Sequence, residues 1–393
     1  MPAGQSVVRV FLVAGEESGD RLGAPLMAAL KAKTKGAVEF FGVGGAQMAS
    51  AGLVSLFPLD KTAIIGFGQI LPRLWAYLRR IRQAAASAVT LKPDVLVIID
   101  SPEFTHRVAK HVRRHAPEIP IIDYVSPSVW AWRPWRARSM HRYVDHVLAL
   151  LPFEPRVLTE LGGPSATYVG HPLIERVGAL RPNADEAAES LRPPAQVLLM
   201  PGSRSGELKR MLPLFERIAM TLSGRVTALE FVVPAVEAHA AQLIRKLAKW
   251  RVPVRVVSAP DEKDAAFRRA RLAIVKSGTG TLELALAGVP MVATYQVSAV
   301  EAFVARRMLK VPSVILANLV LGENVVPEFL QEDATVEKIV GAALPLFEDS
   351  PERARQVEAF KRLDDIMEIG RLVPSERAAE MVLGYATKAR PKV

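Results

Sequence analysis

The sequence contains no cysteine among its 393 residues. The chain therefore forms no disulfide and no thiolate metal site, and it offers no cysteine nucleophile. It also has no apolar run near the ~18–20 residues that a membrane-spanning helix needs. Its first residues, Met-Pro-Ala-Gly-Gln-Ser, lack the basic and apolar regions of a signal peptide. These absences exclude zinc fingers and disulfide-rich domains, and they predict a protein that stays in the cytoplasm.

The net charge and the chain length further limit the classes of protein to which this chain can belong. Lysine and arginine number 51 against 40 aspartate and glutamate, a formal net charge of +11. Such an excess predicts an acidic partner, and nucleic acid, an anionic membrane or a phosphorylated substrate would each qualify. A chain of 393 residues exceeds what one hydrophobic core usually supports, so two domains are expected.

Short apolar, β-branched runs alternate with helical stretches along the chain, which is typical of buried parallel sheets. Predicted strands in the first half lie at 7–14, 38–41, 95–100, 119–125 and 147–150. Those in the second half lie at 197–200, 229–233, 254–257, 272–275 and 289–293. We predict an α/β protein with two Rossmann-like domains facing a cleft. The expected divisions are a first domain at 1–175, a linker at 176–195, a second domain at 196–350, and helices at 351–393 that pack back across the cleft.

The most informative segment reads Lys-Ser-Gly-Thr-Gly-Thr-Leu-Glu at 276–283, directly after the apolar run 271–275. Small residues between a buried strand and a helix let backbone N–H groups and the positive end of the helix dipole approach a phosphate. Glu283 lies one turn into the helix, where it can accept ribose hydroxyls. The alternative is an ordinary helix cap with two turn glycines. The residues expected to hold the diphosphate are Ser277, Gly278, Thr279, Gly280 and Thr281.

A second turn of this kind, Pro-Gly-Ser-Arg at 201–204, follows the strand at 197–200. Arg204 then lies at the carboxyl end of a parallel strand, where ligands bind in such sheets, and its guanidinium suits phosphate oxygens. The alternative is that Ser203 caps a helix beside a solvated arginine. Neither turn has the G-x-G-x-x-G pattern, and the P-loop pattern is absent. Two phosphate-type turns in one half of the chain nevertheless favour a nucleotide.

Polar loops also follow the first two strands of the first half. One is acidic and bracketed by glycines at 15–20, and the other is Gly-Val-Gly-Gly at 42–45. Both allow backbone to approach a sugar, although Asp20 in a simple helix cap is the alternative. The residues expected on the acceptor side are Glu16, Ser18, Gly19, Asp20, Gly44 and Gly45.

Asp100 ends the apolar strand at 95–100 and precedes Ser-Pro-Glu-Phe. A carboxylate at this edge of a parallel sheet could take a proton from an acceptor hydroxyl. The alternative is a helix cap, because Pro102 suits the first turn of a helix.

Residues 124–138 interleave three of the five tryptophans with three arginines. This composition suits stacking on bases, on anionic lipid headgroups or on a sugar phosphate. The alternative is a loop whose tryptophans pack on the core. The spacing of apolar and basic residues at 67–82 predicts a basic amphipathic helix of the kind that lies on membranes, although most such helices cover a sheet. Its expected membrane residues are Phe67, Leu71, Leu74, Trp75, Arg73, Arg79, Arg80 and Arg82.

The histidines indicate a functional site less clearly than these motifs do. His106, His111 and His115 are roughly helix-spaced, but no carboxylate motif makes them a metal site, so we expect them on the surface. His171 lies at the domain junction, where it either faces the cleft or caps a turn. The acceptor-side set is completed by Ser126, Trp132, Arg133 and His171.

Taken in order, these motifs resemble lipid-A-disaccharide synthases over residues 7–385. The matching segments read AGEESGD (14–20), GVGG (42–45), DSP (100–102), VSPSVWAWR (125–133), LPFE (151–154), VGHP (169–172), PGSR (201–204) and SGTGTLE (277–283). The resemblance implies a GT-B glycosyltransferase fold of two Rossmann-like domains. It also implies a peripheral enzyme on the cytoplasmic face of the inner membrane.

The reaction implied by the resemblance moves 2,3-diacylglucosamine from UDP-2,3-diacylglucosamine to 2,3-diacylglucosamine 1-phosphate. The products would be the β-1,6-linked lipid A disaccharide 1-phosphate and UDP. The family's general base maps to Asp100, its nucleotide-site arginine to Arg204, and polar groups near the donor to Asn318 and Gln331. Anionic membrane lipids are an expected partner. We expect no nucleic acid, no metal and no cofactor to bind, and a homodimer is left open.

Some residues depart from the family's pattern. Glu103 and Thr105 stand where aspartate and asparagine are usual, Lys276 replaces an alanine, and Glu17 adds a charge.

Two rival functions remain at this point. One is another GT-B enzyme, such as a UDP-GlcNAc epimerase or a peptidoglycan glycosyltransferase. The other is a non-catalytic protein that binds nucleic acid or membrane.

Overall fold

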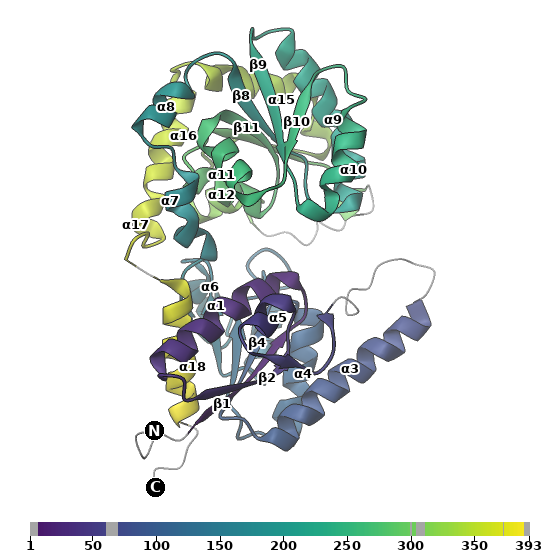
Figure 1. Ribbon diagram of the computed structural model, residues 1–393, viewed down its shortest axis with the longest axis vertical. Coiled ribbons are helices and arrows are strands. Elements are labelled where there is room, and N and C mark those ends of the chain that lie inside the picture. The colour runs from purple at the N-terminus through teal and green to yellow at the C-terminus, as the bar shows by residue number, and fades with distance from the viewer. Residues whose placement is uncertain (1–6, 60–69, 299–300, 304–310, 372, 389–393) are drawn as a thin grey trace. The chain divides into compact units, whose positions relative to one another are not determined.

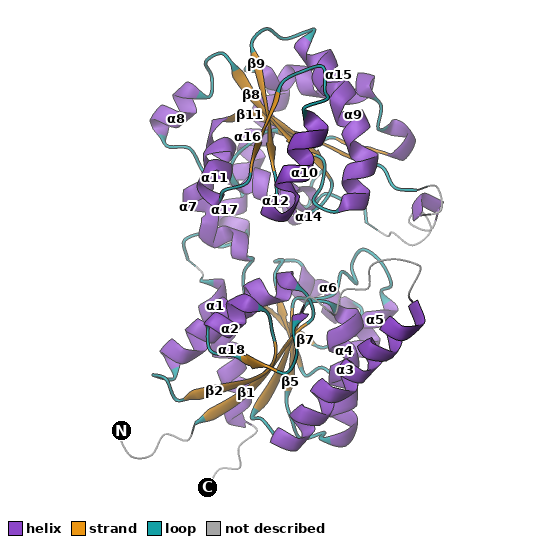
Figure 2. Ribbon diagram, turned by 45° about the vertical axis from the view of Figure 1, so that its right-hand side comes forward, coloured by secondary structure: helices purple, strands orange, loops and turns teal. Residues whose placement is uncertain are grey.

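The computed structural model describes residues 7–59, 70–298, 301–303, 311–371 and 373–388. The chain divides into two compact units. The first contains the residues up to Pro172 together with those from Gly370 onward, and the second contains Leu173–Ile369. Figures 1 and 2 show that each unit is a sheet covered by helices.

The first unit is built on a parallel sheet with the strand order β3-β2-β1-β4-β5-β6-β7. Its strands are β1 (Val8–Ala14), β2 (Val38–Val43), β3 (Val54–Ser55), β4 (Val95–Ile99), β5 (Ile121–Tyr124), β6 (His146–Ala149) and β7 (Ser165–Tyr168). Strand order reverses between β1 and β4, which pair directly. The loops after these two strands therefore diverge to opposite faces, which is the place where ligands bind in open α/β sheets.

Successive residues of each strand point to opposite faces of the sheet, so the strands contribute to two hydrophobic cores. In β1, Val10 and Leu12 belong to one core, whereas Phe11 and Val13 belong to the other. Helices α1 (Glu17–Lys33) and α18 (Pro374–Lys388) pack on the first face, and α3 (Ile70–Leu91) and α4 (Pro102–His115) pack on the second. Shorter helices are α2 (Ala46–Ser50), α5 (Trp135–Met140) and α6 (Glu154–Glu160).

The second unit repeats the architecture, with the strand order β10-β9-β8-β11-β12-β13. Its strands are β8 (Ala195–Met200), β9 (Leu229–Pro234), β10 (Val254–Val257), β11 (Ala270–Lys276), β12 (Met291–Tyr295) and β13 (Glu328–Leu330). Its helices are η3 (Pro172–Arg176), α7 (Val177–Leu180), α8 (Ala184–Glu189), α9 (Ser205–Ser223), α10 (Glu237–Leu247), α11 (Pro260–Arg269), α12 (Thr279–Leu286), α14 (Leu316–Leu321), η4 (Gln331–Asp333), α15 (Val336–Ala343), η5 (Leu344–Phe347), α16 (Pro351–Lys361) and α17 (Leu363–Ile366).

The predicted α/β class with two Rossmann-like units is confirmed, and every predicted strand is present. The short strands β3, β7 and β13 were not predicted. The segment 176–195, expected to be a linker, contains α7 and α8. Of the helices expected to pack back, α16 and α17 belong to the second unit, and α18 belongs to the first.

The side chain of Gln356 explains the placement of α16. Its amide oxygen accepts from Met291 N at 2.8 Å, and its amide nitrogen donates to Met291 O at 3.1 Å. Phe360 and Leu363 are buried in the same unit. This pair of hydrogen bonds fixes α16 to the first residue of β12, a contact that helical periodicity alone does not predict.

None of the helices within the described residues is both long and apolar enough to cross a membrane.

Candidate functional site

Asp100 follows β4 at the reversal of strand order in the first unit. Its φ is 54° and that of Ser101 is 46°, so two successive non-glycine residues hold left-handed backbone. Such residues cost on the order of 1–3 kcal/mol each and cluster at functional sites. Ser18 Oγ donates to Asp100 Oδ2 at 2.5 Å, and Ser101 N donates to Oδ1 at 2.6 Å. The carboxylate is thereby fixed at the sheet edge beside the first turn of α1.

The acidic loop after β1 lies directly against this carboxylate. A Cβ on Gly15 would lie 2.6 Å from Ser101 Cβ, and one on Gly19 would lie 2.9 Å from Ile99 O. Only glycine allows α1 to approach β4 this closely. Ser101 Oγ donates to Glu16 Oε1 at 3.3 Å. The structure therefore brings Glu16, Ser18 and Gly19, three of the residues predicted on the acceptor side, together with Asp100. That these residues bind the acceptor stays a prediction.

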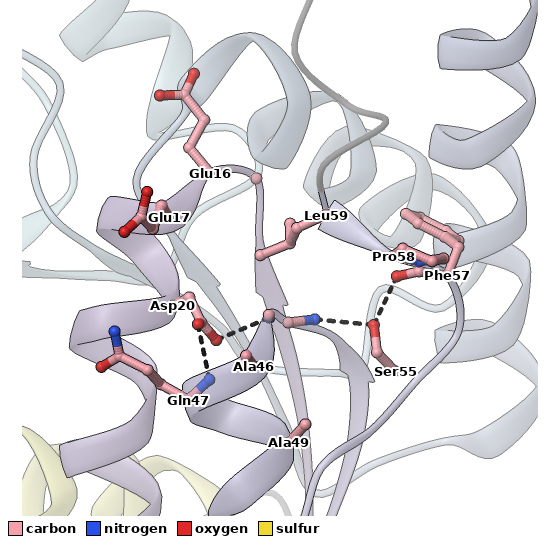
Figure 3. A pocket seen from close by; sticks show the side chains of 13 residues that line it. Glu16, Glu17, Asp20, Ala46, Gln47, Ala49, Ser55, Phe57, Pro58 and Leu59 are labelled. Atoms are coloured by element: carbon pink, nitrogen blue, oxygen red, sulfur yellow. Dashed lines mark hydrogen bonds between the residues drawn. The ribbon is translucent and has the colours of Figure 1, made fainter. Parts of the chain in front are cut away.

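A cavity of about 760 Å³ opens beside this loop, and Figure 3 shows it from close by. Its volume is within the range of about 300–1,000 Å³ that is usual for small-molecule sites. The loops after β1 and β2 and the segment after β3 line it: Gly15, Glu16, Glu17, Asp20, Gly44, Gly45, Ala46, Gln47, Ala49, Ser55, Phe57, Pro58 and Leu59. Four residues predicted on the acceptor side are among them.

Asp20 lines the cavity, but its carboxylate is occupied by the fold. The residue is 3% exposed, and its two oxygens accept from Gly45 N at 2.7 Å, Gln47 N at 3.0 Å and Met48 N at 3.0 Å. Figure 3 shows the carboxylate turned toward the start of α2. Asp20 thus fixes the Gly44-Gly45 turn by capping α2, which is a neighbouring helix rather than its own.

Replacing Asp20 by asparagine is expected to lower the free energy of unfolding by about 1–2 kcal/mol, because the amide nitrogen would face a buried N–H that needs an acceptor. Urea unfolding followed by circular dichroism measures this. Gln47→Ala is the matched control, since it keeps the backbone donor and removes an exposed side chain. Equal unfolding midpoints for the two variants would contradict the capping role.

The tryptophan-rich segment divides between core and surface. Trp130 is half-buried, its Nε1 donates to the buried Glu154 Oε1 at 3.1 Å, and its ring packs edge-on against Phe153. Burial raises the pKa of Glu154 to about 7. Trp132 and Trp135 are 39% and 62% exposed, and the Arg133 guanidinium stacks over the Trp132 ring at 4.2 Å. Ser126 is buried, and its hydroxyl donates to Pro127 O at 3.1 Å.

The prediction that the α4 histidines are all on the surface is wrong for His106, which is 7% exposed. Its Nε2 lies 3.1 Å from Asp123 Oδ2 and its Nδ1 lies 3.0 Å from Tyr143 Oη. Asp123 was not foreseen, because it stands inside the apolar run of β5. His171 is half-buried at the end of the first unit.

In the second unit, the segment predicted to bind a diphosphate forms the turn between β11 and α12. Gly278 has a φ of 152°, and within the described residues no side chain caps this start of α12. Ser277 Oγ donates to Val314 O at 2.8 Å, and Thr281 Oγ1 donates to Gly278 O at 2.8 Å. Both hydroxyls thus shape the turn. Thr279, by contrast, is exposed.

The second turn is joined to the first by a residue that sequence reasoning missed. Glu207 Oε2 accepts from Ser203 N at 3.2 Å and from Arg204 N at 3.4 Å, while Lys276 Nζ donates to Oε1 at 3.0 Å. Lys276 is 15% exposed, so it does not extend into solvent, and its ammonium lies 4.4 Å from the centre of the Tyr295 ring. The Arg204 side chain is 82% exposed. The two predicted turns therefore lie side by side, linked by an ion pair.

Three further residues, predicted to lie at the binding site of the UDP-sugar donor, make contacts within the protein. Glu283 Oε1 accepts from Arg176 Nη1 at 3.0 Å, and burial raises the pKa of its carboxyl. Asn318 is 2% exposed and hydrogen-bonds to the backbone of Val325 and Val326. Gln331 contacts Val297 N at 3.3 Å. Direct contact of these side chains with a donor stays a prediction.

The amphipathic helix is α3. Phe67 and the side chains of Leu71, Arg73 and Leu74 lie outside the described residues. Further along, Ile81, Ala84, Ala85 and Ala88 are buried against the first sheet. Trp75 is 66% exposed, Arg79 and Arg82 are exposed, and Arg80 lies over the Phe57 ring at 5.3 Å. The second half of α3 thus covers the sheet with one face and presents basic residues on the other.

Within the part of the chain that the structure describes, no three His, Cys, Asp or Glu side chains lie together in a way that could hold a metal ion.

Comparison with known proteins places this geometry in a family. The family model described as lipid-A-disaccharide synthetase matches residues 10–382. The lipid-A-disaccharide synthase of Nitrobacter hamburgensis is 53% identical over 381 residues, covering 97% of this chain and 96% of the relative.

Solved structures agree on the fold at low identity. The UDP-GlcNAc 2-epimerase from Neisseria meningitidis, bound to UDP-GlcNAc, is 13% identical with a TM-score of 0.59, covering 98% of this chain and 100% of its own. MurG from Acinetobacter baumannii is 14% identical with a TM-score of 0.58, covering 96% and 99%. The architecture is that of GT-B glycosyltransferases, and the chain belongs to the lipid-A-disaccharide synthase family.

Proposed function

We propose that the chain transfers 2,3-diacylglucosamine from UDP-2,3-diacylglucosamine to 2,3-diacylglucosamine 1-phosphate with inversion at the anomeric carbon. The products are the β-1,6-linked disaccharide 1-phosphate and UDP. One observation carries the proposal for the chemistry. Asp100 is held in left-handed backbone at the edge of the first sheet, oriented by Ser18, beside a cavity of about 760 Å³.

In the proposed step, Asp100 accepts the proton of the acceptor 6-hydroxyl while that oxygen attacks the anomeric carbon of the donor. The bond from the anomeric carbon to the diphosphate breaks, and the electron pair leaves with UDP. A single displacement of this kind inverts the configuration. Ser18 and the backbone of Ser101 fix the carboxylate, which keeps its position constant as substrates change.

The donor diphosphate is proposed to bind at the paired turns of the second unit. The N-terminal N–H groups of α12, Lys276 and the exposed Arg204 supply positive charge there. Such fixed donors stabilise the charge that develops on departing UDP. We assign to the same proposed site the ribose contact predicted for Glu283 and the polar groups of Asn318 and Gln331 predicted near the donor.

Both substrates carry acyl chains, so we propose that the enzyme acts as a peripheral protein on the cytoplasmic face of the inner membrane. The described part of α3 supports docking, because Arg79 and Arg82 are exposed on the face away from the sheet and Trp75 is 66% exposed. Basic residues attract anionic headgroups, and an exposed tryptophan suits the interface.

Arg79→Gln is expected to weaken binding to vesicles rich in anionic lipid about fivefold, since one basic residue near such a surface contributes about 1 kcal/mol. Cosedimentation with vesicles measures the change, and added salt should shrink the difference. Arg251→Gln, an exposed arginine of the second unit, is the control. Equal losses in the two variants would show that docking by α3 is not the cause.

The proposed substrates are tested by comparing donors. With 2,3-diacylglucosamine 1-phosphate as acceptor, UDP-2,3-diacylglucosamine should be consumed, and UDP-GlcNAc should not. Release of UDP, followed by a coupled assay, gives both rates. Comparable rates with both donors would favour a GT-B enzyme that acts on unacylated sugars.

A further inference from the structure

A second, smaller cavity lies between α4 and the segment that follows β5. Its volume is about 170 Å³. The side chains that matter for its chemistry are Glu103, His106, Arg107, Lys110, Arg136 and Tyr143. A space of this size holds a phosphate group and a few waters, and it is too small for an acylated sugar.

Positive charge dominates the cavity. Arg107, Lys110 and Arg136 supply three cations, and Glu103 is the single carboxylate among the lining residues. Glu103 forms a close ion pair with Arg136 and lies 3.8 Å from Arg107. Hydrogen bonding to Arg136 lowers the pKa of Glu103, so this carboxylate stays ionised. With three cations and one carboxylate, the lining keeps a net positive charge.

The inner wall is preorganised. Tyr143 and His106 are each 7% exposed, and the Tyr143 hydroxyl lies 3.0 Å from His106 Nδ1. The opposite ring nitrogen lies 3.1 Å from the buried Asp123. With both ring nitrogens engaged, the imidazole is fixed and holds the Tyr143 hydroxyl at the wall. Lys110 Nζ lies 4.9 Å from the centre of the Tyr143 ring, so one cation is held above the same wall.

The two cavities differ in charge. The described lining of the larger one contains the acidic residues Glu16, Glu17 and Asp20 and no basic residue, so it offers no cation to a phosphate. The smaller one begins at Pro102 and Glu103, the first residues after the Asp100-Ser101 turn. We propose that the smaller cavity binds a phosphate monoester, namely the 1-phosphate of the acceptor sugar. This proposal rests on the proposed function and adds the subsite that recognises the acceptor's charged end.

The probe is D-glucosamine 1-phosphate, titrated by ³¹P NMR in the presence of saturating UDP, which blocks the nucleotide turns. Arg107→Gln with Lys110→Gln should weaken its binding about tenfold or more, because contacts to a charged group contribute roughly 1.5–3 kcal/mol. Both residues are exposed, so the fold should persist. Lys110→Gln alone should give an intermediate loss of affinity for the probe. This single variant keeps the test decisive if the double variant unfolds.

Arg114→Gln, an exposed arginine near the end of the same helix, is the matched control and should bind the probe normally. Binding of the probe by the double variant as tightly as by the unmodified chain would overturn the subsite, as would no binding by the unmodified chain. The readout needs no turnover. Failure of the glycosyl transfer itself would appear instead as an absence of UDP release with both acylated substrates present.

In steady-state assays, the double variant should raise KM for the phosphorylated acceptor and leave KM for the donor unchanged. An acceptor that lacks the phosphate should be used equally well by both proteins. Equal KM values for the phosphorylated acceptor would also overturn the proposal.

Discussion

Asp100→Asn is expected to lower kcat roughly 10²- to 10⁴-fold, the usual contribution of a general base. Asparagine keeps the shape of the side chain, and its amide oxygen can still accept from Ser18, but it cannot take the acceptor proton. Donor binding should change little, because the turns proposed to bind the nucleotide belong to the other unit. Steady-state kinetics with both acylated substrates, together with UDP calorimetry, separate the two effects.

Ser18→Ala is a useful companion variant. It removes the hydroxyl that donates to Asp100 Oδ2 at 2.5 Å but leaves the carboxylate in place, so kcat should fall less than in Asp100→Asn. A nearly normal kcat in Asp100→Asn would remove Asp100 from the chemistry, whatever Ser18→Ala does.

Arg204→Ala is expected to weaken UDP binding about 10- to 100-fold, since a contact between arginine and phosphate contributes ~1.5–3 kcal/mol. Its side chain is 82% exposed and meets Glu207 only at 3.6 Å, so it is available to a ligand. Glu283→Ala should also weaken UDP if that carboxylate binds the ribose. Isothermal titration calorimetry measures both.

Lys209→Ala is the matched control for Arg204→Ala, because Lys209 is an exposed basic residue of α9, the helix that begins directly after Arg204. Its UDP affinity should equal that of the unmodified chain. If Arg204→Ala and Glu283→Ala both bind UDP with unchanged affinity, the nucleotide site lies elsewhere.

The main elements of the fold could be predicted because parallel strands leave a strong signal. The run Val-Leu-Val-Ile-Ile before Asp100 is fully buried as β4, and its end marks the sheet edge where Asp100 lies. The turns at 201–204 and 276–283 were found in the same way. Short edge strands such as β3, with two residues, carry too few residues for such a pattern.

Contacts between distant residues could not be predicted. Glu207 and Lys276 are 69 positions apart, and only the pairing of β8 with β11 brings them together. Asp20 caps α2, a helix that begins at Ala46, so a local capping rule assigns it to the wrong helix. His106 looks like a surface residue until Asp123 of β5 is placed beneath it.

Inverting transfer between two acylated sugars yields one defined product, so the structure of the product tests the proposed reaction. Purified protein is incubated with UDP-2,3-diacylglucosamine and 2,3-diacylglucosamine 1-phosphate, and the product is analysed by mass spectrometry and NMR of the anomeric carbon. We expect one UDP to be released per disaccharide 1-phosphate formed, with the two sugars joined through a β-1,6 linkage. An α-linked disaccharide, or UDP release without a disaccharide, would contradict it.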